Sequence, residues 1–232
     1  MEAERTAATR AAWVAGSGSP RTKSARAFTL IELLVTIACV VLTVAVLLPA
    51  LHRAKPRTKR VGCTNGMKQI GLAFRTFAID NNDHLPMQVS VANGGTMELA
   101  ASGAVFPHFQ VLSNELNTPK ILFCPNDKNR TWPTNFTSDL TDKHLSYFLN
   151  MDSVAGDGTS LLCGDRNITN RALPGSRLVN LTKGTTIAWT KELHSGQGNL
   201  GFGDGSVQGL VNRRVSSVLQ IPAGVTNRLA VP

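Results

Sequence analysis

The sequence predicts an α+β fold, with helical segments first and an antiparallel sheet after them. Three observations lead to this fold class: a long uncharged apolar run near the N-terminus, an apolar stripe at helical spacing just after it, and a series of short β-type runs in the C-terminal half. Helices that precede a run of strands, without strand–helix alternation, are typical of α+β proteins.

The composition indicates a folded protein with a distinct N-terminal leader. Of the 232 residues, 42% are hydrophobic and 17% charged, which is too apolar and too weakly charged for a disordered chain. Four cysteines are too few for a disulfide scaffold. Residues 1–27 carry five basic and two acidic side chains and are rich in small residues, so we expect an unstructured basic leader.

An uncharged run from Leu33 to Leu51 predicts a transmembrane helix. It has nineteen residues, and further apolar residues extend it back to Phe28. About 20 helical residues cross the roughly 30 Å hydrocarbon core of a bilayer. A cleaved secretory signal is the alternative, but its apolar region would be shorter and a small-x-small cleavage site would follow it. We therefore expect residues 28–51 to cross the membrane.

Glu32 is the one charged residue inside this stretch. A charge in lipid costs about 2.5–3.5 kcal/mol on insertion scales and usually has a partner. Either Glu32 lies close enough to the interface to stay hydrated, or a cation is created nearby. The orientation of the membrane helix is also open. The basic cluster at 53–60 would, on a positive-inside count by itself, place the C-terminal part in the cytoplasm.

The segment Ala27-Phe-Thr-Leu-Ile-Glu-Leu-Leu-Val35 resembles the signal of type IV prepilins and type II secretion pseudopilins. The resemblance implies that a prepilin peptidase cuts between Ala27 and Phe28 on the cytoplasmic side and N-methylates the new terminus. Glu32 is then the fifth mature residue, and Pro49 falls where pilin helices commonly carry a proline. The family usually has Gly before the cut, so with Ala27 we expect cleavage to be slower.

This resemblance also implies a topology and a function. The leader is cytoplasmic, the chain crosses the inner membrane once, and the C-terminal part is periplasmic, against the charge count. Glu32 would pair with the Phe28 amine of a neighbouring subunit and fix the axial register. The implied protein is a structural pilin-like subunit, not an enzyme, and its implied partners are the prepilin peptidase, other pilin or pseudopilin subunits, the inner-membrane assembly platform and membrane lipid.

An apolar stripe follows the membrane segment at a 4-3-4-3 spacing and predicts an amphipathic helix over 52–83, ended by Asp80-Asn-Asn-Asp83; its members are Cys63, Met67, Ile70, Phe74 and Phe77. Together with the membrane segment it resembles the long pilin helix, whose second half packs on a sheet. The alternative is a separate helix after a break at Pro56.

Residues 84–232 are expected to form a periplasmic α+β domain with one modest core. A short helix is predicted at Phe109–Leu116, and another around Val215–Leu219. Turn signals separate the predicted strands, which are Lys120–Phe123, Leu145–Leu149, Arg177–Leu181, Thr185–Thr190, Asn199–Phe202 and Ser206–Val211.

A second resemblance lies near the C-terminus. His194, nine residues and then Asp204-Gly205 resemble the His-x9-Asp-Gly element of prepilin-like proteins of planctomycete and verrucomicrobial type. Three other stretches are similar to that group as well: Cys63–Leu72, Phe123–Asp127 and Gly164–Asn167. From the residues alone, Asp204-Gly205 predicts a type I′ hairpin turn.

The alternative to a plain hairpin turn at Asp204-Gly205 is a calcium site. Major pseudopilins hold calcium in a late loop, and by that resemblance Asp204 would join Asp165, Asp157 or Asp152, with Asp165 the favoured partner, since calcium takes six or more oxygens. Zinc or a Cys–His nucleophile at His194 is disfavoured because no Cys-x2-Cys pair or other catalytic motif is present.

The cysteines allow one exported disulfide in an oxidising compartment. Cys39 lies in the membrane segment, which leaves Cys63, Cys124 and Cys163. Because Cys63 lies on the stripe expected to face the sheet, Cys63–Cys124 is the favoured pair.

Two other functions remain open. A mature charge of +6 would suit a membrane-anchored module for DNA uptake or adhesion. The basic residues gather near the membrane and the chain has three Trp and one Tyr, so stacking platforms are scarce and we do not expect nucleic acid as a partner. The prepilin signal would alternatively serve only as an anchor for an envelope domain of another role.

Overall fold

A computed structural model describes residues 28–170, 177–219, 221–222 and 224–232. The expected leader, with Ala27, lies outside these residues. Contacts within the chain divide it into two compact units, with the boundary between Pro49 and Ala50. Each unit is described by itself.

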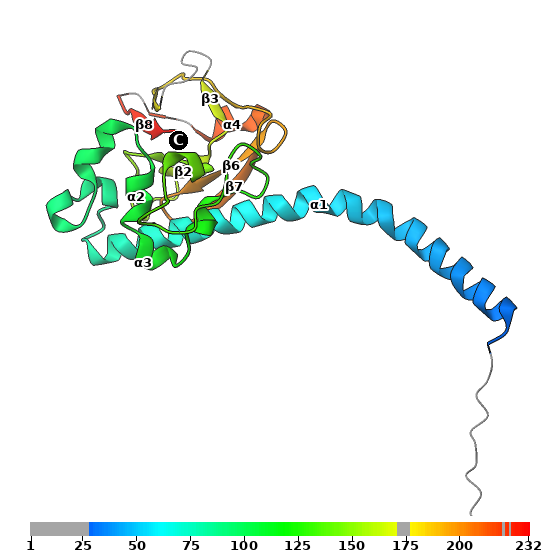
Figure 1. Cartoon of the computed structure of the whole chain (residues 1–232). Helices are drawn as coiled ribbons and strands as arrows, with labels where there is room; N and C mark the ends of the chain where they lie inside the picture. Colours follow the sequence, from blue (N-terminus) through cyan, green and yellow to red (C-terminus); the bar gives the residue numbers. More distant parts are fainter. Residues whose placement is uncertain (1–27, 171–176, 220, 223) are drawn as a thin grey trace, which may run out of the picture. The chain divides into compact units, whose positions relative to one another are not determined.

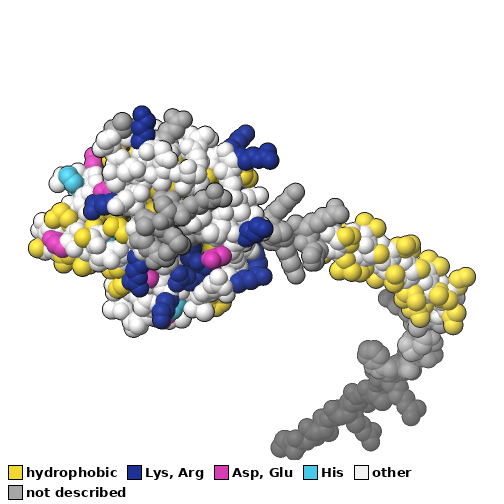
Figure 2. Space-filling view, turned by 90° about the horizontal axis from the view of Figure 1, so that it is seen from above, with side chains coloured by type: hydrophobic (Ala, Val, Ile, Leu, Met, Phe, Trp, Pro, Cys, Tyr) yellow, Lys and Arg dark blue, Asp and Glu magenta, His cyan; other side chains and the backbone are white. Residues whose placement is uncertain are grey.

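The first described element is the helix α1, Leu30–Asp80, whose first part belongs to the N-terminal unit. The segment Leu30–Pro49 is long and apolar enough to cross a membrane, and none of it is buried within the protein. Figure 2 shows its hydrophobic side chains gathered along the helix. The helix passes Pro56 without a break, so the alternative of a separate second helix is wrong.

The rest of α1 forms part of the C-terminal unit and of its core. All five residues of the predicted stripe are buried, with Cys63, Met67, Ile70 and Phe74 fully so. The helix ends at Asp80, where predicted, because Asn82 and Asp83 adopt positive φ angles of 54° and 60°. The amide of Asp83 then donates to the carbonyl of Ala78 at 2.8 Å and closes the last turn.

A six-stranded antiparallel sheet lies against this helix (Figure 1). Its strand order is β4-β8-β1-β2-β6-β7, with the bounds β1 Tyr147–Asn150, β2 Leu161–Asp165, β4 Leu178–Leu181, β6 Gln197–Phe202, β7 Val207–Val211 and β8 Asn227–Ala230. A second, two-stranded sheet pairs β3 (Ile168–Asn170) with β5 (Ile187–Trp189), and the helix α4 (Asn212–Val218) contacts β5 and β7.

The central strands β1, β2 and β6 of the large sheet are buried on both faces. Successive side chains of a strand point to opposite faces. Tyr147 and Leu149 of β1 therefore belong to the core cluster that contains the α1 stripe, whereas Phe148 belongs to a second cluster with Trp189 and Val215. The sheet is the middle layer between α1 on one side and β3, β5 and α4 on the other.

Residues between α1 and the sheet form short helices that cover the first core cluster. Their bounds are η1 Pro86–Gln88, η2 Val91–Asn93, η3 Met97–Ser102, α2 Phe106–Gln110, α3 Ser113–Leu116, η4 Pro119–Leu122 and η5 Asp142–His144. The predicted helix Phe109–Leu116 is thus two short helices.

The predicted strand Lys120–Phe123 is wrong: Pro119 starts the 3-10 helix η4, and the Thr118 hydroxyl caps the amide of Lys120 at 3.5 Å. The strands β2, β3 and β8 were not predicted. The other predicted strands and the C-terminal helix are confirmed within a few residues.

Candidate functional site

The start of α1 holds the residues of the predicted cleavage and assembly signal. Thr29 precedes the helix, and its amide and hydroxyl both donate to Oε2 of Glu32, at 2.9 and 2.8 Å. In return the amide of Glu32 donates to the Thr29 hydroxyl at 3.3 Å. This reciprocal pair is a capping box, in which two otherwise unpaired helix donors are satisfied. The Thr-x-x-Glu signal is visible in the sequence, and the prediction for Glu32 overlooked it.

The other residues of the signal lie around this box. Phe28 is exposed just before it, and Pro49 is the last residue of the apolar segment, where α1 continues. Within the N-terminal unit, the carboxylate of Glu32 is held by Thr29.

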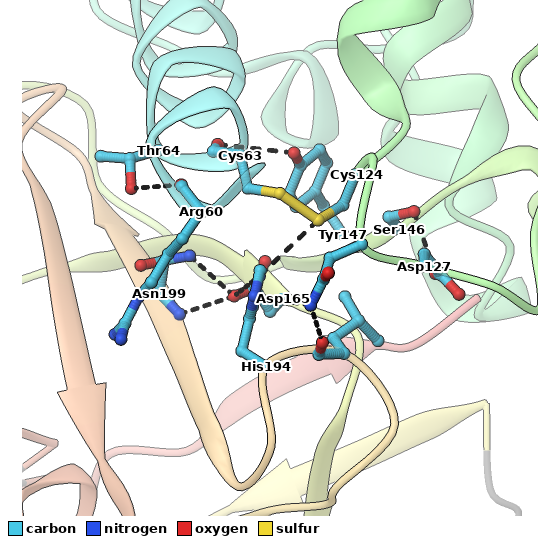
Figure 3. Close-up of a disulfide and its surroundings, with 12 residues drawn as sticks. Arg60, Cys63, Thr64, Cys124, Asp127, Ser146, Tyr147, Asp165, His194 and Asn199 are labelled. Carbon is cyan, nitrogen blue, oxygen red and sulfur yellow. Dashed lines mark hydrogen bonds and ion pairs between the residues drawn. A yellow bond between two sulfur atoms is a disulfide. The ribbon is translucent and has the colours of Figure 1, made fainter. Parts of the chain in front are cut away.

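The C-terminal unit contains a buried cluster around a disulfide (Figure 3). Cys63 of α1 is bonded to Cys124, which follows η4, and this is the pair that the sequence favoured. Nε2 of His194 lies 3.6 Å from Sγ of Cys124 and 3.4 Å from Oδ2 of Asp165. Asp165, at the end of β2, also accepts from the backbone and side-chain amides of Asn199, at 2.7 and 2.9 Å. By default, a lone histidine in this stretch of sequence is expected on the surface or packed against a turn; His194 is 8% exposed, so a surface position is wrong.

Burial decides the charges of this cluster. It lowers the pKa of His194 to about 4, with the nearby charge of Arg60 acting in the same direction. Burial also raises the pKa of Asp165 to about 7, although the amides of Asn199 and the charge of Arg60 favour the carboxylate. At neutral pH His194 is therefore an uncharged imidazole, so its contact with Asp165 is not an ion pair.

Two of the motifs singled out in the sequence meet beside the disulfide. Asp127, three residues after Cys124, accepts two hydrogen bonds from Arg166, at 2.6 and 2.7 Å, and one from the hydroxyl of Ser146 at 3.0 Å. Burial acts to raise the pKa of Asp127, but the hydrogen bonds and charge of Arg166 outweigh it and lower the pKa. Arg166 also pairs with Glu192, two residues before His194, at 2.9 Å. Through Asp127 and Glu192, Arg166 therefore connects the segments that contain Cys124, Asp165 and His194.

The other end of the His-x9-Asp-Gly element is a hairpin turn between β6 and β7. The hairpin is confirmed, but the type I′ turn is wrong, because only Gly205 of the turn has a positive φ, 85°. The amide of Gly205 donates to the carbonyl of Phe202 at 2.9 Å, and Ser206 returns to the ladder. Oδ1 of Asp204 accepts from the amide of Ser206 at 2.8 Å and so shapes the turn.

The calcium site expected from Asp165 and Asp204 is wrong as a joint site. Leu161 pairs with Phe202 and Gly164 with Leu200, so Asp165 and Asp204 lie beyond opposite ends of the paired segment. Five strand residues measure about 16 Å at 3.3 Å each, whereas a calcium ligand lies about 2.4 Å from the ion. One ion therefore cannot bind both carboxylates.

The strand β6 connects these two ends and follows α1. Arg60 contacts Gln197 at the start of β6, and a Cβ on Gly201 would lie 3.3 Å from the side chain of Met67. At the turn, a Cβ on Gly71 would lie 3.1 Å from Cα of Gly205, so glycine at 71 allows the helix and the turn to approach closely. The element that starts with His194 and ends with Asp204-Gly205 thus attaches β6 to α1 at both ends.

The two remaining cysteines are free: Cys39 is exposed in the apolar segment, and Cys163 is buried in β2. Burial raises the pKa of the Cys163 thiol, followed in size by the effect of Asp165, so this thiol is unreactive.

A scan against protein-family models found no match to the chain, and searches of curated proteins and of solved structures found none either.

Proposed function

We propose that the chain is a pilin-like structural subunit of a type II secretion or type IV pilus-like filament. The observation that carries the proposal is the start of α1: a helix segment that is apolar, unburied and long enough to cross a membrane, with one carboxylate, Glu32, at its first turn. The basic leader before it and the resemblance of Ala27–Val35 to the prepilin signal support the same conclusion.

In the proposed pathway, the leader stays in the cytoplasm while Leu30–Pro49 crosses the inner membrane once. Prepilin peptidase cleaves between Ala27 and Phe28 and methylates the new amine. The C-terminal unit is then periplasmic, and an ATPase that is a separate protein drives extension of the filament.

Glu32 has two successive partners in this proposal. In a single chain, Thr29 donates to its carboxylate. During assembly, the cationic amine of Phe28 in a neighbouring subunit approaches the same carboxylate, and pairing the two charges removes the cost of leaving either in lipid. Since the pair forms only at one axial offset between subunits, it sets the register of the filament.

The C-terminal unit supports the same function through its attachment to α1. A subunit that is pulled by its helix must carry its exported domain with it. The Cys63–Cys124 disulfide and the contacts of β6 with α1 join the sheet to the helix along the stretch from Arg60 to Gly71.

The proposal is tested by incorporation of a tagged full-length chain into filaments in cells that carry such a machine. We expect Glu32→Ala to be processed like the wild type but to be incorporated at least about tenfold less, since each 1.4 kcal/mol of lost pairing is a factor of ten. Replacement of Asp204 with Asn, in an exposed turn of the C-terminal unit, is the matched control for loss of one carboxylate. Equal incorporation of Glu32→Ala and wild type would contradict the proposed pairing.

A further inference from the structure

We propose that the reduced chain binds one Zn²⁺ ion in the buried cluster, through the thiolates of Cys63 and Cys124, Nε2 of His194 and a carboxylate oxygen of Asp165. The four residues come from α1, the loop after η4, the loop before β6 and the end of β2. This inference does not depend on the proposed function.

The donor atoms already lie close together. The ligand atoms of Cys63, Cys124 and His194 are within 4.8 Å of one another, and all three residues are buried. In a tetrahedral zinc site with ordinary bond lengths, a His nitrogen lies about 3.6 Å from a Cys sulfur and about 3.3 Å from a carboxylate oxygen. Sγ of Cys124 lies 3.6 Å from Nε2 of His194, as in such a site. Asp165 lies outside this group of three, but its Oδ2 is 3.4 Å from the same nitrogen, which brings its carboxylate next to the site.

The two sulfur atoms are the part of the site that must change. They are bonded to each other in the oxidised chain and would have to separate to about 3.8 Å, the sulfur–sulfur edge of a tetrahedral zinc site. Cys124 lies on a loop rather than on a helix or strand, so we expect Cys124 to make this movement, after which the metal sets its distance to His194.

Asp165 supplies an independent sign that a ligand is missing. Its side chain is completely buried, and Oδ1 has no hydrogen-bond partner among the described residues. A buried oxygen without a donor is costly, and a metal ion is one of the groups that satisfies it. The amides of Asn199 hold the carboxylate from the other side through Oδ2, as partners of metal ligands commonly do.

The charges balance when the metal is bound. Two thiolates and one carboxylate against Zn²⁺ leave one negative charge, and His194 is a neutral ligand. Arg60 acts on both Asp165 and His194 and supplies the compensating positive charge. Four protein ligands without an open position indicate a structural site rather than a catalytic one.

The redox step requires a two-electron reductant, for which a dithiol serves as follows. One thiolate of the dithiol attacks the Cys63–Cys124 bond, and its second thiol resolves the mixed disulfide, which leaves two protein thiols and the oxidised, disulfide form of the reductant. Zinc then binds with release of the two thiol protons. Cys63 and Cys124 are therefore linked in both redox states, by a disulfide when oxidised and through a zinc ion when reduced.

The test uses the full-length chain in detergent, reduced with a phosphine that does not compete for metal, and titrated with Zn²⁺ or with Co²⁺ as a spectroscopic probe. We expect one ion per reduced chain, thiolate-to-cobalt charge-transfer absorption, and a higher unfolding temperature with zinc. The unreduced chain should bind none. His194→Gln and Asp165→Ala should each weaken zinc binding at least about tenfold, as expected for loss of one of four ligands.

Cys163→Ser is the matched control, because it removes a buried thiol outside the cluster. It should still bind one ion after reduction. If the reduced chain is unfolded, zinc should restore its structure, since binding to a structural site is coupled to folding. Failure of the folded reduced chain to bind zinc, failure of zinc to refold an unfolded one, or binding that is unchanged by His194→Gln would each overturn the proposal.

Discussion

Thr29 and Glu32 hold each other at the first turn of α1: the amide and hydroxyl of Thr29 donate to the carboxylate, and the amide of Glu32 donates back to the hydroxyl. The one carboxylate in the apolar segment is thus stabilised within its own chain. A carboxylate that is already hydrogen-bonded can enter the membrane interface before a cationic partner is present, and it can exchange its hydroxyl partner for an amine on assembly.

Separating the two roles of Glu32 requires a change to Thr29. Thr29→Ala removes the cap, at a cost of about 1 kcal/mol to the helix start, but leaves the carboxylate available to a neighbour. We expect this variant to be processed and incorporated within about fivefold of the wild type, since the loss is smaller than the 1.4 kcal/mol of a tenfold change. Thr36→Ala, whose hydroxyl bonds only to Leu33 within the helix, is the control. Incorporation as poor as that of Glu32→Ala would mean that capping, not pairing between subunits, is the role of Glu32.

The Cys63–Cys124 disulfide should account for much of the stability of the C-terminal unit. It closes a loop with a sequence separation of 61 residues, and loss of such a bridge typically costs about 2–5 kcal/mol. We expect the double variant Cys63→Ala/Cys124→Ala to lower the free energy of unfolding by this amount in urea titrations. Cys39→Ala, which lies in the apolar segment, should leave the same transition unchanged; an unaltered midpoint in the double variant would contradict a stabilising bridge.

Arg166 should contribute much more to the free energy of unfolding than an exposed arginine in a similar ion pair. Its partner Asp127 has a side chain 1% exposed, so Arg166→Met leaves a buried carboxylate unpaired and should cost about 3 kcal/mol at pH 7. Arg177→Met is the matched control, because Arg177 is 71% exposed and lies 3.7 Å from Asp142. We expect it to change stability by less than about 0.5 kcal/mol.

The pH dependence of the Arg166 variant has a definite sign. The pKa of Asp127 is lowered in the folded protein, so its contribution is complete above the ordinary value of about 3.9 and is lost as the pH falls below it. The difference in the free energy of unfolding between wild type and Arg166→Met should therefore shrink from pH 7 to pH 3. A difference that stays constant would show that the loss comes from packing of the arginine side chain.

Asp165 should make the protein less stable as the pH rises. The folded state holds its proton up to about pH 7, whereas the unfolded chain releases it near 3.9, so between these values the folded state binds more protons. Removing the group by Asp165→Asn should give a variant whose stability relative to wild type increases with pH across this window, by up to about 1.4 kcal/mol per unit. His194, whose pKa is lowered to about 4, acts in the opposite direction in both proteins.

Urea titrations of the oxidised chain from pH 4 to pH 7 measure this effect, with Asp204→Asn as the control. Asp204 is in an exposed turn and its pKa is lowered by its hydrogen bonds with Ser206, so its titration falls below this window. Parallel stability curves for wild type and Asp165→Asn would contradict a buried, proton-holding Asp165.

The parts of the fold that the sequence predicts are those with a local signal. The stripe from Cys63 to Phe77 repeats at helical spacing, and one face of that helix is buried. The hairpin of β6 and β7 has its turn residues at Asp204-Gly205. By contrast, every residue of β2, Leu161–Asp165, is buried on a sheet covered on both faces, so it has no alternation to detect. The strand β8, Asn227–Ala230, begins with two polar residues and likewise shows no alternation of apolar and polar residues.

The cluster around the disulfide depends on long-range packing. His194 is 70 residues from Cys124 in sequence, and Asp165 reaches it only because β2 pairs with β6 in one particular register. The resemblance to calcium-binding pseudopilins suggested a joint role for Asp165 and Asp204, which the register separates. For His194 the sequence favoured a surface or turn-packed position, because nothing in its neighbourhood in the sequence indicates burial.

The central claim is that the chain enters the prepilin pathway, and the N-terminus of the membrane-extracted protein tests it most directly. Mass spectrometry of the intact protein and of its N-terminal peptide, from cells with a prepilin peptidase, should show a chain that begins with N-methylated Phe28. The same chain from cells without the peptidase should keep its leader. A protein that retains residues 1–27 in the presence of the peptidase, or that is cut at another site after the apolar segment, would contradict the claim.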